Sequence, residues 1–188
     1  MKKVAFVAPT YPVLSETFIQ TEVDSVKACG HQVCVMAFKV EESEKAFDYD
    51  IVKIGKDVRA GKIININWLG FVKALSFVSK QTSMPKKSLF AYGFKLALQL
   101  AEKDVNHVHA HFCQHTAAHA IVAAKLLNIT CSFVAHGHDV YEFAYDIEHK
   151  ISSSDFVVAV CKDMQRDFNE LAKGNVKLLH CGVNTQQF

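Results

Sequence analysis

Several motifs that mark common nucleotide-dependent enzymes are absent from this chain of 188 residues. The sequence contains no G-x-G-x-x-G turn, no glycine-rich loop that ends in Gly-Lys-Ser or Gly-Lys-Thr, and no G-x-S-x-G segment. Nicotinamide dehydrogenases, P-loop kinases and α/β-hydrolases depend on these three loops, in that order. Their absence argues against all three classes.

Long apolar runs are also missing. The first apolar run, VAFVA at residues 4–8, ends at Pro9 and is too short for the apolar region of a secretory signal. No stretch approaches the roughly 18 uninterrupted apolar residues of a membrane span. The 6 cysteines form no C-x-x-C pair, which in a chain without an export signal indicates reduced thiols. We therefore expect a cytoplasmic protein.

The chain carries little net charge. A formal charge of +2 is too small to indicate a nucleic-acid-binding protein, so we expect no nucleic-acid partner. The apolar content of 50% is enough to bury the core of one domain of ordinary size. No internal repeat or low-complexity segment divides the sequence.

Short apolar runs alternate with amphipathic segments throughout the chain, which predicts an α/β fold. Strands separated by helices imply right-handed crossovers and a Rossmann-like, mostly parallel sheet with helices on both faces. The first helix is expected to start with Ser15 as its cap and to end at Gly30. Strands are predicted at 3–8, 32–38, 51–54, 105–110, 130–135, 155–160 and 176–180, and the later helices at 62–80, 86–103, 115–128, 142–152 and 162–172.

Polar residues follow three of these strands. Open α/β sheets bind ligands at the carboxyl ends of their strands, where helix N-terminal amides are also exposed. Ser15 and Asp139 have a simpler alternative role as helix caps. The candidate substrate-binding residues at these strand ends are Ser15, Glu16, Thr17, His111, Asp139, Cys161 and Lys162.

Histidines are concentrated in one segment, because 7 of the 10 lie between Asn106 and Phe143. His107, His109 and His111 alternate along one predicted strand and should share a face. The H-x-H spacing suits zinc, so a zinc-dependent hydrolase that uses His109 and His111 is one alternative function. Its third ligand would come from His136, His138 or Asp139.

A second interpretation of these histidines involves no metal. His107 would then be exposed at the start of the strand, His109 would be buried and hydrogen-bonded, and only His111 would reach the mouth of the site. No ligand spacing completes a recognised zinc motif, so we expect no metal site.

The middle of the chain is basic and rich in aromatic residues. Between Val58 and Ala101 the sequence has seven lysines and arginines and no acidic residue. Such a helix pair could lie on an anionic membrane surface, with its lysines at the lipid headgroups. The alternative is two crossover helices packed on the sheet, with their lysines facing water. The candidate membrane surface is residues 59–95.

Four ordered motifs resemble a subgroup of the family-4 retaining glycosyltransferases of bacterial exopolysaccharide and lipopolysaccharide assembly. The opening segment VAFVAPTYPVLSETFI is similar to the "YP…SETFI" start of these enzymes. The later motifs, in the same order, are HVHAHF, SFVAHGHDVYEF with SSSDFVVAVCKDMQRDF, and the final VKLLHCGVNTQQF. Cys161 and Asn184 depart from the pattern, which usually has serine and aspartate there.

The resemblance implies a GT-B enzyme, in which two Rossmann-like domains enclose the active site. Residues 1–180 would form the N-terminal, acceptor-side domain, and residues 181–188 would begin the linker to a C-terminal, donor-binding domain. Because that second domain makes most contacts to the donor in the family, we expect the 188-residue chain alone to be inactive.

The same resemblance implies the chemistry. A sugar would pass from a nucleotide-sugar donor to a saccharide or lipid-linked acceptor, with retention at the anomeric carbon and without a cofactor or an essential metal. His136 matches the histidine that approaches the donor sugar and is the candidate catalytic residue, while Ser15, Glu16 and Thr17 match a loop that faces the cleft. A stand-alone α/β binding module is the remaining alternative.

Overall fold

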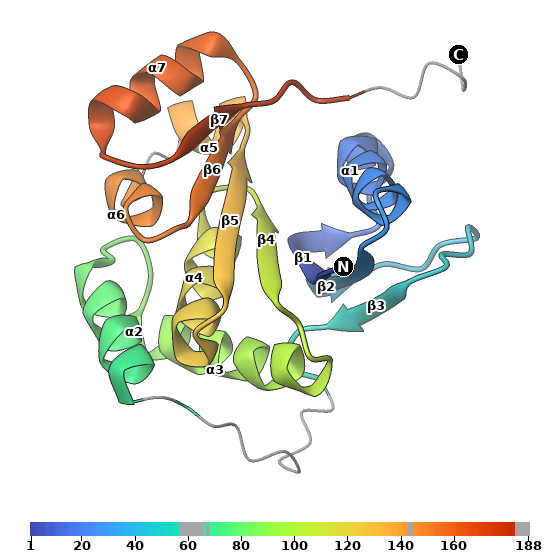
Figure 1. Cartoon of the computed structure of the whole chain (residues 1–188), viewed down its shortest axis with the longest axis horizontal. Helices are drawn as coiled ribbons and strands as arrows, with labels where there is room; N and C mark the ends of the chain where they lie inside the picture. Colours follow the sequence, from blue (N-terminus) through green and yellow to red (C-terminus); the bar gives the residue numbers. More distant parts are fainter. Residues whose placement is uncertain (57–65, 67, 143–144, 183–188) are drawn as a thin grey trace.

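A computed structural model describes residues 1–56, 66, 68–142 and 145–182 of the chain. Its centre is a seven-stranded sheet with the order β3-β2-β1-β4-β5-β6-β7, in which every neighbouring pair is parallel (Figure 1). The predicted α/β class is therefore confirmed. The strands are β1 (Lys3–Tyr11), β2 (Gln32–Val40), β3 (Asp50–Lys53), β4 (His107–His111), β5 (Thr130–Ala135), β6 (Phe156–Ala159) and β7 (Val176–Leu178).

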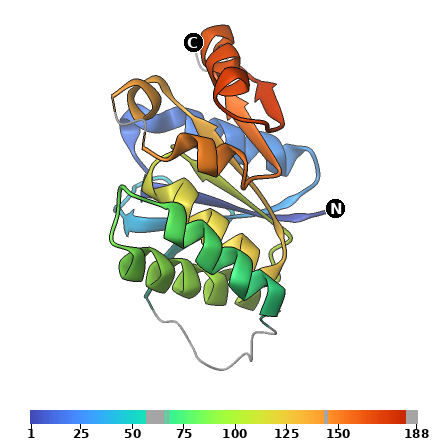
Figure 2. The same cartoon turned by 90° about the vertical axis from the view of Figure 1, so that its left-hand side faces the viewer.

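The helices connect these strands and cover both faces of the sheet. Figure 1 shows α1 on one side of the sheet and α2, α3 and α4 on the other. In Figure 2 the green helices α2 and α3 lie over the yellow helix α4. The helical elements are the 3₁₀ turn η1 (Leu14–Glu16), α1 (Thr17–Ala28), α2 (Trp68–Lys80), α3 (Lys86–Glu102), α4 (His115–Leu127), α5 (Gly137–Tyr141), α6 (Ile147–Ile151) and α7 (Lys162–Leu171).

Alternation along the strands divides the buried side chains into two clusters. On β1, Ala5 and Val7 belong to the larger cluster with α2, α3 and α4. Val4 and Phe6 point to the other face and pack with Ile19 of α1. The period of two in a strand sends successive side chains to opposite faces, and both faces are apolar because both are covered.

Helix α4 lies almost wholly inside the protein, and small residues allow its neighbours to approach it. A Cβ atom added to Gly93 of α3 would lie 2.5 Å from Cγ1 of Val122. A Cβ atom on Gly70 of α2 would collide with the carbonyl oxygen of Lys125. Both glycines are buried and are required by close packing.

The sequence predicted most elements to within a few residues, although β1 runs three residues beyond its predicted end and several helix ends differ. The helix predicted at 142–152 is shorter, because α6 begins only at Ile147, and the short helix α5 before it was not anticipated. The N-cap of α1 is Glu16, without a side-chain cap bond, so the expected cap at Ser15 is wrong. The part of the predicted 62–80 helix at 62–65 and 67, and residues 183–188 of the predicted linker, lie outside the described residues.

All 6 cysteines are free thiols, as the sequence predicted. Cys113 and Cys131 are buried within the larger core cluster, where a small thiol behaves as an apolar residue. Across the described part of the chain, no helix has the length and apolar character that crossing a membrane requires.

Candidate functional site

The carboxyl ends of the parallel strands meet at one edge of the sheet and bring several candidate residues together. His136 follows β5, and its ring centroid lies 4.5 Å from that of Phe18, in the first turn of α1. The His136 ring is also 6.3 Å from that of His111, at the end of β4, and 5.0 Å from that of Phe112. The loop after β1 and the ends of β4 and β5 therefore form one site.

His136 is half-buried in this site, and its Nε2 atom has no hydrogen-bond partner among the described residues. Burial lowers the pKa of His136, so the ring is neutral at pH 7. The side chain lines a cavity of about 240 Å³, together with Phe18, Val160 and His180. The side chain lines the cavity while Nε2 itself is buried, so this neutral imidazole can hydrogen-bond a ligand once Nε2 becomes accessible.

Asp139 organises the loop that carries His136. Its Oδ1 accepts a hydrogen bond from the backbone N–H of His136 at 2.7 Å, and its Oδ2 accepts one from the backbone N–H of Cys113. The side chain is 2% exposed. Because both oxygens bind backbone amides, Asp139 ties the start of α5 to the turn after β4. The helix-cap alternative accounts for it, and its substrate-binding role stays a prediction.

A second cavity, of about 560 Å³, opens on the other side of the same loop. Glu16, Phe112 and Asp139 line it, which places the loop after β1 beside the loop after β5. Burial raises the pKa of Glu16, and its Oε2 has no hydrogen-bond partner among the described residues. Two aromatic residues and three histidines also line it, namely Phe38, Tyr92, His115, His119 and His138.

The other predicted residues lie nearby but make fewer contacts. Ser15 and Thr17 are exposed at the start of α1. Cys161 is the N-cap of α7, and Lys162 is the exposed first residue of that helix. The adjacent Val160 shares the smaller cavity with His136, so the end of β6 borders the site.

The histidine row of β4 faces α1, and the structure corrects two expectations for it. His107 was expected to be exposed, but its ring is half-buried and is hydrogen-bonded to Thr130 and Ser132. His111 was expected to reach the mouth of the site, but it is 0% exposed. Its ring packs near those of Phe18 and His136, and its substrate-binding role stays a prediction. His109 is buried and hydrogen-bonded, as expected.

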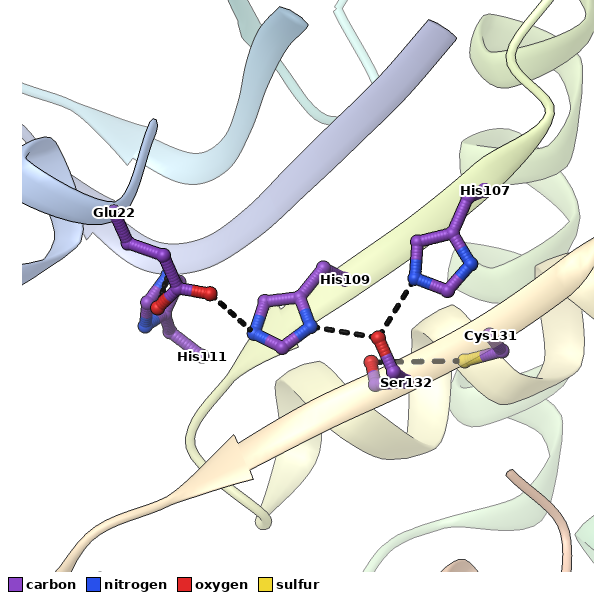
Figure 3. Close-up of polar contacts among 6 residues, drawn as sticks. All are labelled: Glu22, His107, His109, His111, Cys131 and Ser132. Carbon is purple, nitrogen blue, oxygen red and sulfur yellow. Dashed lines mark hydrogen bonds and ion pairs between the residues drawn. The ribbon is translucent and has the colours of Figure 1, made fainter. Parts of the chain in front are cut away.

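Glu22 of α1 completes this row, and the sequence interpretation missed it. Its Oε1 lies 3.2 Å from Nε2 of His109, and its Oε2 lies 3.7 Å from Nε2 of His111 (Figure 3). Burial raises the pKa of Glu22 to about 7 and lowers that of His109 to about 3. Burial also places the pKa of His111 well below its usual value. Both rings are therefore neutral at pH 7.

The third ligand expected for a zinc site is also wrong. Donor atoms of Glu22, His109 and His111 all lie within 4.8 Å of one another. Asp139 is instead occupied by backbone amides, and His138 is exposed and pairs with Glu142 at 3.1 Å. A signal for Glu22 was available, since it lies four residues after Phe18 and four before Val26, in an otherwise apolar row of α1.

The comparison with known families decides the identity of this domain. Residues 15–187 match the model of Glycosyltransferase Family 4. The chain belongs to this family. No curated protein matches it in sequence.

Solved structures of similar fold agree with the family. Acinetobacter baumannii MurG has a TM-score of 0.59 and 12% identity, over 99% of this chain and 47% of that chain. Anabaena Alr3699/HepE, solved in complex with UDP-glucose, has a TM-score of 0.59 and 12% identity, over 98% of this chain and 45% of that chain. A putative UDP-N-acetylglucosamine 2-epimerase from Listeria monocytogenes has a TM-score of 0.56 and 14% identity, over 93% of this chain and 43% of that chain.

These matches define the architecture. The family-4 glycosyltransferase domain has a Rossmann-like fold of the GT-B kind, as the resemblance of its motifs implied. The chain spans less than half the length of each of these three solved structures.

Proposed function

We propose that this family-4 glycosyltransferase domain is the acceptor-side half of a retaining enzyme that transfers a sugar from a nucleotide-sugar. Membership of the family carries the proposal. A complex of one similar structure with UDP-glucose supports a nucleotide-sugar as donor. A C-terminal domain would supply most donor contacts, so the 188-residue chain alone should form no product.

The protein's own residues divide the work at the sheet edge. In the full-length enzyme, His136, which lines the smaller cavity, would hydrogen-bond the donor sugar through Nε2, a buried atom that has no partner among the described residues. Retention at the anomeric carbon removes the need for a general base on the acceptor side, so we assign His136 to orientation of the donor. Neutral imidazole suits this role, because it presents one N–H and one lone pair.

Replacement of His136 by alanine in the full-length protein should lower kcat/KM for sugar transfer about 30-fold, which corresponds to the loss of about 2 kcal/mol of transition-state stabilisation. His136→Gln, which can keep a donor near the Nε2 position, should recover part of the rate. Product formation is measured by chromatography, and the configuration of the new bond by NMR. Unchanged kinetics in His136→Ala would contradict the assignment, and an inverted product would contradict retention.

The larger cavity supports a lipid-linked or saccharide acceptor. Its volume of about 560 Å³ and its aromatic side chains Phe38, Tyr92 and Phe112 suit a sugar ring stacked on an aromatic face or an apolar lipid segment. Glu16 and His115, on the rim of the same cavity, could bind hydroxyl groups. Ser15, Thr17, Cys161 and Lys162 follow the neighbouring strands β1 and β6, where they would bind substrate.

An exposed apolar face on α2 supports attachment of the enzyme to an anionic membrane. Trp68 is 76% exposed and Leu69 is 56% exposed, and Val72 and Leu75 continue the same surface. Lys73 and Lys80, on the same helix, are also exposed. Apolar side chains beside lysines suit the headgroup region of a bilayer. Residues 59–65 and 67 of the candidate surface lie outside the described residues.

Flotation with vesicles tests this attachment. The protein should float with vesicles that contain phosphatidylglycerol, and Lys73→Glu/Lys80→Glu should reduce the bound fraction at least tenfold, because each cation near such a surface contributes about 1 kcal/mol. Lys173→Glu/Lys177→Glu makes the same charge change at exposed positions after α7 and on β7, and should bind as the wild type does. An equal loss of vesicle binding in both variants would show that only the net charge matters. No flotation of the wild type would contradict the proposal.

A further inference from the structure

The hydrogen bonds around the β4 histidines have a direction that can be traced from one end. The Thr130 hydroxyl lies 3.2 Å from the carbonyl oxygen of Asn106, which can only accept, so the one hydroxyl proton is donated there. Nδ1 of His107, 2.8 Å from the same hydroxyl oxygen, must then donate to it. The neutral ring of His107 is left with a bare Nε2, which accepts the hydroxyl proton of Ser132 at 2.7 Å.

The same logic continues to Glu22. Having donated its proton to His107, Ser132 accepts from Nδ1 of His109 at 2.7 Å (Figure 3). The Nε2 of His109 therefore carries a lone pair, and this lone pair faces Oε1 of Glu22 at 3.2 Å. Two acceptors at hydrogen-bond distance require a proton or a cation between them.

His111 decides between the two. It is 0% exposed, and neither of its ring nitrogens has a hydrogen-bond partner among the described residues. A proton on Glu22 that is donated to His109 satisfies that pair alone, because Nε2 of His111 lies 3.7 Å from Oε2, beyond hydrogen-bond distance for its own N–H. A cation would be bound by the lone pairs of both rings and by the carboxylate at once.

We propose that Glu22, His109 and His111 bind one divalent transition-metal ion, with Zn²⁺ as the natural probe. Zinc–nitrogen and zinc–oxygen bonds of about 2.0–2.1 Å place two tetrahedral ligands about 3.3 Å apart. The separations of 3.2 Å from His109 Nε2 to Oε1 and of 3.7 Å from His111 Nε2 to Oε2 are within about 0.4 Å of this value. One donor atom from each of the three residues lies within 4.8 Å of the others, and the two rings lie edge to face with their planes at 84°.

The surroundings fit a metal site in two further respects. Ser132 accepts the Nδ1 proton of His109 and so fixes the tautomer in which Nε2 carries the lone pair. A histidine that binds a metal usually donates its other ring N–H in this way. Glu22 also lines the cavity of about 240 Å³, which offers an access route and room for a further ligand. Since Glu22 lies on α1 and the histidines lie on β4, the ion would fasten α1 to the sheet. The ion has no part in the proposed sugar transfer, and the proposal departs from the sequence expectation of no metal site.

Metal analysis of purified protein tests the proposal. Cys29→Ser/Cys181→Ser is the background, because both thiols are exposed and would bind zinc on their own. After removal of metal with EDTA and reloading with Zn²⁺, we expect one equivalent of zinc per chain. Glu22→Gln should lower zinc affinity at least 100-fold, and Ser132→Ala should lower it about 10- to 100-fold. His138→Ala, at the exposed pair with Glu142, should leave both stoichiometry and affinity unchanged.

Thermal unfolding gives an independent reading. Zinc at about 100 times its Kd should raise the Tm of the background protein by about 5–10 °C and leave that of Glu22→Gln unchanged. Circular dichroism shows whether Glu22→Gln is folded, and Ser132→Ala replaces it in this comparison if it is not. Absence of stoichiometric zinc, or full retention of zinc by Glu22→Gln and Ser132→Ala together, would overturn the proposal.

Discussion

Lowering the pH from 7 to 5 should remove about 6 kcal/mol from the free energy of unfolding of the metal-free protein. Burial holds the pKa of four histidines below the ordinary value, at about 3 for His109 and about 4 for His107 and His119, and well below it for His111. In the unfolded chain these rings titrate near 6.5. As the pH falls below 6.5, the unfolded chain takes up protons that the folded chain does not, so unfolding is favoured.

The size of the effect follows from these values. Each such histidine contributes about 2 kcal/mol between pH 7 and pH 5. Glu22 acts in the opposite direction, because its pKa is raised to about 7 in the fold. Over the same interval the folded chain binds a proton at Glu22 that the unfolded chain does not, which returns about 2 kcal/mol. The histidines outnumber the carboxyl group, so acid destabilises the protein.

Urea unfolding at pH 7 and pH 5, followed by circular dichroism, measures this difference. His119→Gln removes one titrating ring at a position outside the Glu22 network and should reduce the pH dependence by about 2 kcal/mol. Glu22→Gln should change it in the opposite direction and make the acid effect larger. Equal unfolding midpoints at the two pH values in the wild type would show that these rings are not held neutral.

Replacement of Asp139 by alanine should lower the free energy of unfolding by about 3 kcal/mol. The carboxylate accepts hydrogen bonds from the backbone N–H groups of His136 and Cys113, and its removal leaves both donors buried without a partner. Asp139→Asn keeps one acceptor oxygen and should lose about half as much. Because Asp139 positions the loop of His136, the alanine variant should also lose sugar transfer at temperatures where it remains folded.

Asp163 provides the matched control for Asp139. It lies in the first turn of α7, as Asp139 lies in the first turn of α5, but its side chain is 75% exposed. Its contact with Arg166, at 3.2 Å, is a surface ion pair of small energy. Asp163→Ala should therefore change the free energy of unfolding by no more than about 0.5 kcal/mol. A similar loss in both variants would indicate that the Asp139 bonds contribute nothing special.

Local pattern was sufficient to predict the sheet, because most strands are short apolar runs between polar turns, and β4 alternates histidines with Val108 and Ala110. The predicted and observed bounds of β5 are identical, and those of β7 differ only at one end. The segment between β5 and β6 was harder, since its two helices have only five residues each and no clear period. Asp146, at the start of α6, adopts a left-handed backbone that separates them.

The site was predicted in its residue types and only partly in its geometry. Their position at strand ends identified His136 and Asp139 as candidates. The structural role of Asp139 could not be predicted, because its carboxylate accepts a hydrogen bond from the backbone N–H of Cys113, 26 residues away. Glu22 was missed because a single acidic residue in a helix is ordinarily solvated. Its partial burial results from the docking of α1 against β4, and the local signal for it is the otherwise apolar row of α1 in which it lies.

The two faces of β4 pack against different parts of the protein. Val108 and Ala110 point into the apolar layer beneath α4, while His107, His109 and His111 point toward α1. Neighbouring residues of this short strand thus contact different helices. Substitutions at the even-numbered positions should therefore disturb the packing beneath α4, and substitutions at the odd-numbered positions should disturb the docking of α1, so the two layers can be probed separately within one strand.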